Sequence, residues 1–537
     1  MERILYNGVI HAGEKQKRTC SAVYIKNGVI MALGNDTEIL QKKTEHVQTE
    51  DLGGKHVFPG FIDSHMHLLE TAQQDSLIHL DKAKSFDDVV RLCREKLQSA
   101  KESHKWICGI SFNQDDWDVK LIPTRKDLDR ISCDVPVTIR RVCLHVSVCN
   151  TKAMELMGVS RQVPEELEEF FDKDEAGVPN GIIREAAQTI ISDAQTSLTK
   201  EETKELIKAG CLRAAAKGIT EIQTDDFHSS KDDGELIIAA YRELAEKDEL
   251  PVRIYQQNYL PDKESLQRFL ARGHYTGETF GLFRLGPLKV IMDGSLGSHS
   301  AYMRTPYLND PETRGLCYHE KEELYQLCRL AHDSGMQIAA HCIGDGALAD
   351  ILEVYAKIQR ENPRADCRHG VVHCQIMDDE QTEAFRKLDL IGYIQPIFLR
   401  CDMNIVDDCV GTQMGRQSYN WRRFIDLGVH ISGGSDSPVE SFDVLPNLQY
   451  AVTRKNPDTG KSWYPENSLT LDEAMQIFTW EGAYASFAER TRGSIEAGKE
   501  ADLTILSEDP AAVDIDCLRE IQVLETVVKG RTVFTVE

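Results

Sequence analysis

Short apolar runs alternate with amphipathic segments through the middle of the chain. Four helices are predicted between the runs. Three of them end at a glycine, the usual residue just past a helix C-terminus. Their ranges are 200–217, 320–333, 346–360 and 418–427. The apolar runs predict strands at 60–65, 219–224, 251–256, 286–291, 337–341, 370–373, 391–395 and 430–434. Eight strands separated by helices are typical of the α/β class and predict a (β/α)8 TIM-type barrel, although the count draws in part on the polar motifs described below.

The two ends of the chain show a different pattern, of short strands joined by tight turns. Asn7-Gly8 and Asn27-Gly28 each lie between short apolar runs, which is the strongest local signal for a β-hairpin. The end of the chain contains similar runs at 501–506 and 527–534. Because such small sheets need more strands to be stable, we expect residues 1–57 and 485–537 to form one small β-sandwich. The barrel then spans residues 58–484.

The stretch between the first two predicted strands, about 150 residues, is far longer than a barrel crossover needs. We therefore expect an insertion at about 70–205. It contains a predicted helix at 85–101, apolar runs at 106–110 and 136–139, and an acidic segment around 164–175. Since loops at the carboxyl ends of barrel strands form active sites, the insertion is expected to cover the site. After the barrel, Thr470 and Glu473 predict a capping box at the start of a long helix from Leu471.

Composition and charge limit the classes of partner. The sequence is 41% hydrophobic and 28% charged, as in a water-soluble globular protein, and its formal net charge is −25. That charge argues against nucleic acid and against anionic membrane surfaces. The fifteen cysteines include no C-x-x-C pair, so we expect reduced, mostly buried thiols. The N-terminus lacks an apolar signal region and no run reaches 18 apolar residues, so we expect a cytoplasmic protein without a membrane segment.

The first predicted barrel strand ends in a motif suited to metal binding. His65 and His67 are separated by one residue, and in an extended segment such side chains point to the same face. Two neutral imidazoles can then reach one ion, with zinc or another divalent first-row metal as the best match. A lone His-x-His pair is more often ordinary loop or core histidine, so the interpretation depends on polar residues further along the chain.

Four further polar residues lie at or near the ends of later predicted strands: Lys289, His341, His373 and Asp436. Each alone has an ordinary structural explanation, as a lysine reaching outward, hydrogen-bonded core histidines, or a turn aspartate. Lys289 is nevertheless unusual in an otherwise apolar strand, because burying an unpaired ammonium is costly. Residues at the carboxyl ends of barrel strands converge on one site. A single metal site explains all six residues together, whereas the structural explanations are independent of one another.

These motifs resemble those of a known family. The stretch 59–67 (Pro-Gly-Phe-Ile-Asp-Ser-His-Met-His), followed in order by Lys, His, His and Asp, is similar to the amidohydrolase superfamily of metal-dependent hydrolases. The sequences around Lys289 and His341 resemble the amidohydrolase-3 branch, which includes N-substituted formamide deformylases and YtcJ-like proteins. The resemblance runs nearly end to end, to the closing β-sandwich motif at 498–503. The resemblance is specific for the superfamily and gives almost no information about the substrate.

The resemblance implies a binuclear centre and a mechanism. His65 and His67 would bind the first of two divalent ions, with zinc expected, and His341 and His373 the second. Lys289 would bridge them as a carbamate formed with carbon dioxide, because an unmodified lysine with a pKa near 10.4 is a poor ligand at neutral pH. Asp436 would bind the first ion and act as general base and then general acid. The activity implied is hydrolysis of a non-peptide, amide-like C–N bond by metal-activated hydroxide.

Three more residues are candidates for substrate binding: His145 and Glu185 in the insertion, and His299 after the Lys289 strand. Asp293 is expected to shape the loop after that strand. The alternatives left open are a deaminase or an ester or lactone hydrolase on the same scaffold. A non-enzymatic assembly protein is disfavoured, because all six positions hold residues of the expected type. The partner expected is a small-molecule amide-like substrate, with no nucleic acid and no membrane, and a homo-oligomer is left open.

Overall fold

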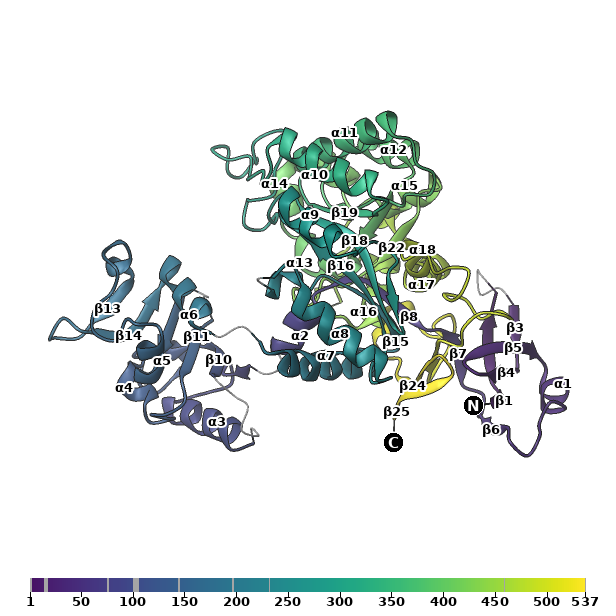
Figure 1. Ribbon diagram of the computed structural model, residues 1–537, viewed down its shortest axis with the longest axis horizontal. Coiled ribbons are helices and arrows are strands. Elements are labelled where there is room, and N and C mark those ends of the chain that lie inside the picture. Colours follow the sequence, from purple (N-terminus) through teal and green to yellow (C-terminus); the bar gives the residue numbers. More distant parts are fainter. Residues whose placement is uncertain are drawn as a thin grey trace. The chain divides into compact units, whose positions relative to one another are not determined.

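The structure is a computed structural model with two compact units, residues 1–71 with 200–537 and residues 72–199 (Figure 1). The residues that the structure describes are 2–13, 18–74, 77–99, 106–142, 145–195, 198–230, 232–457 and 459–536. None of the helices in these ranges is both long and apolar enough to cross a membrane.

The centre of the first unit is a nearly closed barrel of parallel strands, which confirms the predicted α/β barrel (Figure 1). Among the described residues its strands follow the order β8 (Phe61–Met66), β15 (Ile219–Thr224), β16 (Arg253–Tyr259), β18 (Phe283–Ile291), β19 (Ile338–Cys342), β20 (Gly370–His373), β21 (Ile391–Ile394) and β22 (Ile431–Gly433). Each overlaps one of the eight predicted ranges. The first and last strands approach each other where the Ser64 hydroxyl donates to the Gly433 carbonyl at 2.6 Å.

Helices follow the barrel strands and bury their apolar faces against them. They are α7 (Lys200–Ala215), α8 (Glu235–Glu246), α9 (Lys263–Ala271), α10 (Lys321–Asp333), α11 (Asp345–Glu361), α12 (Asp379–Leu388), α14 (Val406–Gln417), α15 (Trp421–Asp426) and α16 (Val444–Thr453). Helices were predicted where α7, α10, α11 and α15 lie. Gly218, Gly335 and Gly428 follow three of them with φ of 81°, 82° and 71°, so each occupies the left-handed region where glycine is unstrained.

The segment after the barrel differs from its prediction. Thr470 accepts from the Glu473 backbone N–H while Glu473 accepts from the Thr470 N–H, which confirms the capping box. The predicted long helix is wrong, because α17 (Leu471–Ile477) and α18 (Trp480–Ala485) are separate. Thr479 has φ −135° and ψ −91°, outside the helical region, and its hydroxyl donates to the Met475 carbonyl at 2.7 Å. The side chain thus ends the first helix by bonding to its last turn.

Strands from both ends of the chain share one sheet. Its order is β25 (Arg531–Thr535), β24 (Val523–Val528), β23 (Leu503–Leu506), β7 (His56–Pro59), β2 (Val9–Ala12) and β3 (Arg18–Cys20). A second sheet has the order β5 (Val29–Gly34), β4 (Ala22–Lys26), β1 (Glu2–Tyr6) and β6 (Gln48–Asp51). Leu5 and Val23 of this sheet belong to the same buried apolar cluster as Val57 and Leu503 of the other. The single sandwich from both ends stays a prediction, whereas the pairing of β7 with β23 is observed.

Deleting residues 498–537 is expected to give insoluble or unfolded protein. The deletion removes β23, which pairs with β7 over the whole of that strand, and uncovers the buried side chain of Val57. An exposed apolar strand edge also invites aggregation. Soluble yield and far-ultraviolet circular dichroism would measure the effect against the full-length chain. A soluble, fully active truncation would show that the two ends do not depend on each other.

The insertion is a unit with its own sheet and core. The sheet order is β13 (Phe171–Lys173), β14 (Pro179–Arg184), β12 (Val146–Cys149), β11 (Val137–Arg141), β10 (Ile107–Phe112) and β9 (Ile78–His79). The predicted helix at 85–101 corresponds to α3 (Phe86–Ser99), and residues 100 and 101 lie outside the described residues. Leu80, Val89 and Val137 belong to a cluster contained in this unit. That the insertion covers the active site stays a prediction.

Candidate metal centre

The His-x-His motif lies where β8 ends, and both rings point to one carboxylate. His65 Nε2 and His67 Nε2 are each 3.2 Å from Asp436 Oδ1. His65 is almost fully buried, and His67 is 17% exposed. The three ligand atoms lie within 4.8 Å of one another, close enough to hold one ion. The period of two along an extended strand thus produces the convergence that the sequence predicted.

Backbone contacts with β8 hold Asp436 in place. The backbone N–H groups of Ser435 and Asp436 donate to the His65 carbonyl at 3.2 and 2.8 Å. Asp436 has a φ of 57°, and for a residue with a side chain this left-handed conformation is strained unless its surroundings enforce it. A Cβ on the preceding Gly434 would lie 2.7 Å from the His65 nitrogen. Glycine is therefore required for the approach that brings Asp436 to the two histidines.

The two later histidines face each other across the ends of β19 and β20. His341 Nδ1 and His373 Nε2 are 2.9 Å apart, and the rings of His65 and His373 have centroids 5.7 Å apart. His373 has a φ of 83°, again in the left-handed region. A strained backbone at a strand end is typical of positions where a side chain must be aimed into a site. All four histidines therefore lie in one cluster.

Lys289 lies beside the first pair of histidines. Its Nζ is 3.2 Å from His65 Nε2 and 3.8 Å from Asp225 Oδ2, and its side chain is 2% exposed. Burial lowers the pKa of Lys289 from its usual value, against the opposing attraction of Asp225 and Asp436. The amine thus loses its proton more easily than a surface lysine does.

Asp225 is a neighbour that the sequence prediction missed. From the sequence, the alternative to a carbamate is an ordinary ion pair of Lys289 with a nearby carboxylate such as Asp293. Asp293 instead accepts backbone N–H groups from Tyr302, Ile343 and Gly344 at 2.9, 3.0 and 2.8 Å, which confirms its expected role in shaping the loop. The signal for Asp225 was its place immediately after β15, the same strand-end position that the other candidates occupy.

The outer nitrogen of each histidine faces an oxygen acceptor. His65 Nδ1 is 2.8 Å from Gln257 Oε1, and His67 Nδ1 is 2.8 Å from the Asp225 carbonyl. His373 Nδ1 is 2.9 Å from Gln395 Oε1, and His341 Nε2 is 3.3 Å from the Gly294 carbonyl. Because a ring N–H must point at each acceptor, the inner nitrogen of each neutral ring carries a lone pair. The sequence prediction missed Gln257 and Gln395. Both are polar residues in or just after a buried strand, and that position is the signal that could have identified them.

The electrostatics keep three of these rings neutral. Burial, together with the nearby Lys289 charge, lowers the pKa of His65 to about 4 and that of His341 to about 3. Burial and the adjacent His341 hold the pKa of His373 well below its usual value. Burial also lowers the pKa of His67, but Asp436 and Asp225 outweigh it, so that this pKa rises to about 9. A cation on the inner nitrogens would replace the proton that His67 otherwise holds.

The residues present fit a metal centre. Inward lone pairs at 2.9 Å repel each other unless a proton or a cation lies between them, and the buried Asp436 Oδ1 lies 3.2 Å from two further inward ring nitrogens. Two imidazoles and a carboxylate form one donor set, and two imidazoles beside a buried lysine form another. Imidazole nitrogen and carboxylate oxygen are the usual ligands of zinc and similar divalent ions.

Replacing Gln395 with leucine is expected to lower metal affinity by about 10–100-fold, the usual cost of losing a partner that orients a ligating histidine. The Gln395 amide nitrogen donates to the Tyr393 carbonyl at 3.3 Å, which fixes its oxygen toward His373. Metal retained against a competing chelator would measure the effect. Gln413→Leu on the exposed face of α14 is the matched control. Equal retention in both variants would contradict an orienting role.

The three predicted substrate-binding residues contact other residues of their own unit. His299 Nδ1 is 3.2 Å from Asp310 Oδ2, and its ring packs against Tyr307 with centroids 4.7 Å apart. His145 Nδ1 and Glu185 Oε2 pair at 2.8 Å in the insertion, where both side chains are more than half exposed. These residues have local partners, and their contact with substrate stays a prediction.

The barrel and its polar strand ends place the chain in the class of metal-dependent hydrolases with an α/β barrel. An Amidohydrolase family model matches residues 48–534, so the chain belongs to the amidohydrolase family. It is 30% identical to YtcJ of Bacillus subtilis (strain 168) over 99% of both chains. It is 25% identical to the N-substituted formamide deformylase of Arthrobacter pascens, over 98% of this chain and 97% of that one.

The fold has a close match among solved structures. An uncharacterized metal-dependent hydrolase from Pyrococcus furiosus superposes with a TM-score of 0.80 at 25% identity, over 95% of this chain and 100% of that chain. The likeness covers 95% of this chain, so it extends well beyond the barrel. The chain is an amidohydrolase-family metal-dependent hydrolase, as its strand-end motifs predicted.

Proposed function

We propose that the protein hydrolyses a non-peptide, amide-like C–N bond in a small molecule. The observation that carries the proposal is the arrangement of four inward-facing imidazole nitrogens around Asp436 and Lys289 at the carboxyl ends of the barrel strands. The likeness to an N-substituted formamide deformylase favours an amide-like substrate over an ester or lactone. The deformylase activity is that of the relative, and an amide-like substrate for this chain is the proposal.

Two groups of residues would hold two divalent ions, for which zinc is the proposed identity. His65, His67 and Asp436 form one group, and His341 with His373 forms the other. When bound, such ions lower the pKa of a coordinated water from 15.7 toward about 7 and polarise a carbonyl group. The donor set supports this assignment because it contains imidazole nitrogens and carboxylate oxygen with no thiolate.

Lys289 is proposed to carry a carbamate. The neutral amine nitrogen attacks the carbon of carbon dioxide and releases one proton, leaving an anionic N-carboxylate with two oxygen atoms. Burial favours this step because it lowers the pKa of Lys289 and so raises the fraction of neutral amine. The product also removes the cost of a buried ammonium and places negative charge between the two histidine pairs.

Asp436 is proposed to move the proton. Its Oδ1 is the oxygen that faces His65 Nε2 and His67 Nε2 at 3.2 Å and would hold the first ion. The second carboxylate oxygen, Oδ2, would then take the proton of the attacking water and deliver it to the departing nitrogen. The left-handed backbone and the two bonds to the His65 carbonyl keep the carboxylate in place during both transfers.

A screen of metal-replete protein against N-formyl, N-acyl and cyclic amides tests the proposal. Esters, lactones and amino-substituted heterocycles serve as the competing classes. Release of an amine and a carboxylic acid from at least one amide class is the expected result. Release of ammonia from a heterocycle, or turnover of esters alone, would overturn the assignment of the bond.

A further inference from the structure

Two clusters outside the barrel centre bring three potential metal ligands together among the described residues. One contains His332, Cys367 and His369. The other contains His11, His56 and Asp509. The two differ in how the nitrogens of their rings are used, and this difference decides which can hold an ion.

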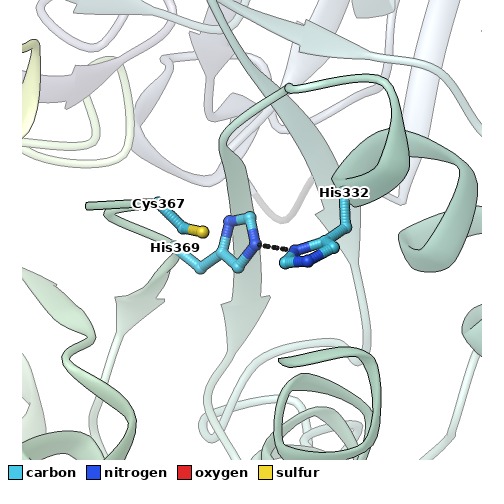
Figure 2. A group of neighbouring side chains, drawn as sticks. All are labelled: His332, Cys367 and His369. Atoms are coloured by element: carbon cyan, nitrogen blue, oxygen red, sulfur yellow. Dashed lines mark hydrogen bonds between the residues drawn. The ribbon is translucent and has the colours of Figure 1, made fainter. Parts of the chain in front are cut away.

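The first cluster has no nitrogen free for a metal (Figure 2). The Ile338 backbone N–H donates to His369 Nδ1 at 3.1 Å, so the proton of this ring lies on Nε2. That nitrogen donates to His332 Nδ1 at 2.9 Å, and His332 Nε2 donates to the Asn362 carbonyl at 2.7 Å. Figure 2 shows the two rings meeting edge to edge with Cys367 beside them. All four ring nitrogens are used, so this cluster is a buried hydrogen-bond chain.

The second cluster lies on the sheet that both chain ends share. In this sheet β2 runs parallel to β7, with Val9 opposite His56. His11 follows Val9 by two residues and therefore lies on the same face as His56. The ring of His11 stacks on Phe58 with centroids 4.0 Å apart, which fixes its orientation. Asp509 comes from the other end of the chain, three residues after β23 ends at Leu506.

The rings of this second cluster make few hydrogen bonds. Within the described part of the chain, His11 and His56 hydrogen-bond only to each other, Nε2 to Nδ1 at 3.3 Å. Asp509 Oδ2 is 3.8 Å from His56 Nδ1, too far for a hydrogen bond. Asp509 Oδ1 accepts the Ala511 backbone N–H at 2.9 Å, which turns the other oxygen toward the rings. A hydrogen-bonded pair explains the contact of the rings, whereas the carboxylate faces His56 without reaching hydrogen-bond distance.

The spacing of the two ring nitrogens matches that of metal ligands, and a bound ion would draw Asp509 Oδ2 in from its present 3.8 Å. Zinc–nitrogen bonds of 2.0–2.1 Å in a tetrahedron place neighbouring ligand atoms about 3.3–3.4 Å apart. The ring nitrogens are 3.3 Å apart, and the three ligand atoms lie within 4.8 Å of one another. His56 and Asp509 are about one-fifth exposed, so water can complete the coordination.

We propose that His11, His56 and Asp509 form a second, half-buried site for a divalent first-row metal ion, with Zn²⁺ as the best fit and water as the remaining ligand. The ion links the N-terminal strands to the segment after β23 and stabilises the sheet on which the two ends meet. No oxygen acceptor orients the outer ring nitrogens among the described residues, so this site binds more weakly than the barrel centre and fills after it. The proposal is independent of the substrate and of the reaction.

Zinc titration of protein whose barrel centre is already loaded tests the site. Wild-type protein is expected to take up one equivalent of Zn²⁺ more than His11→Asn or His56→Asn, and Asp509→Asn is expected to bind about tenfold more weakly. His46→Asn, at an exposed histidine in a nearby part of the sequence, is the matched control and should titrate like wild type. Zn²⁺ should also raise the melting temperature of wild type and of the control by a few degrees, and not that of the two histidine variants.

Cobalt provides a second readout that is independent of stability. Co²⁺ added to the loaded protein should give visible absorption bands that are absent in His56→Asn. The half-buried positions of the three side chains make misfolding of the variants a minor risk, and Asp509→Asn, which lies in a loop, keeps the test open if a strand variant is unstable. Equal zinc stoichiometry and equal cobalt spectra in wild type and the three variants would overturn the proposal.

Discussion

Replacing His65 or His67 with alanine is expected to remove most of the metal and to reduce hydrolysis to background. Both inner nitrogens lie 3.2 Å from Asp436 Oδ1, so either change leaves one imidazole and one carboxylate where three donors met. The loss of a divalent ion returns the pKa of the attacking water toward 15.7, which leaves almost no nucleophile at neutral pH. Elemental analysis and turnover of the same preparations would measure both losses.

The control for this experiment must separate metal loss from unfolding. His65 is buried, so its replacement also leaves a cavity that destabilises the barrel by roughly 1–3 kcal/mol. Circular dichroism and a thermal melt on each variant measure that loss of stability. The loss should be smaller for His67→Ala, because His67 is the more exposed of the two. Normal activity with unchanged metal stoichiometry in a folded His67→Ala protein would rule out the assignment.

Replacing Lys289 with alanine is expected to remove metal and activity together, and short carboxylic acids should partly restore both. A carbamate supplies two oxygen atoms from an anionic group, and acetate or propionate can occupy the space that truncation leaves. Lys289→Arg should remain inactive, because the guanidinium group stays cationic and cannot form a carbamate. Turnover with increasing acetate, followed with metal content, would measure the rescue.

The structure identifies the partner that Lys289 would have in an ordinary ion pair, which is the alternative to a carbamate. The carboxylate within 4 Å of its amine is that of Asp225, at 3.8 Å, so an ordinary ion pair would be with this residue. In that case Lys289→Arg should retain substantial activity, because arginine preserves the positive charge. A ¹³C signal of a carbamate carbon after incubation with labelled bicarbonate would separate the two explanations directly. An active, metal-loaded Lys289→Arg protein without that signal would leave a site built from the histidines and Asp436.

The sequence alone determined the order of the barrel strands and the residues at their ends. Period-two spacing placed His65 and His67 on one face, since the geometry of an extended strand is a local property. Apolar runs and terminal glycines located the eight strands and most of the predicted helices, because these patterns are also local properties of the chain. The ends of parallel strands meet at one edge of a barrel, so Lys289, His341, His373 and Asp436 could be assigned to one site before any distance was known.

Tertiary structure decided which neighbours surround these residues. Gln257 on β16 lies within hydrogen-bond distance of His65 on β8, although β15 separates the two strands in the sheet, and Gln395 lies within that distance of His373 on the neighbouring strand. The closure and register of the barrel produce these contacts, and no local pattern encodes them. The same holds for Asp225, which takes the place beside Lys289 that the sequence suggested for Asp293. The left-handed backbone at Asp436 also depends on contacts with β8, a segment more than 350 residues earlier in the chain.

The insertion and the sheet shared by both chain ends also depend on contacts that the sequence did not predict. The apolar runs at 106–110 and 136–139 fall on β10 and β11, but only the pairing of these strands made a six-stranded sheet with a core of its own. His11, His56 and Asp509 carried no motif in the sequence, because they come from β2, from β7 and from the segment after β23. Local sequence specifies strands, turns and caps through short-range sterics and hydrogen bonds. Contacts between distant segments depend on how all the strands pack, and that arrangement is decided only in the folded chain.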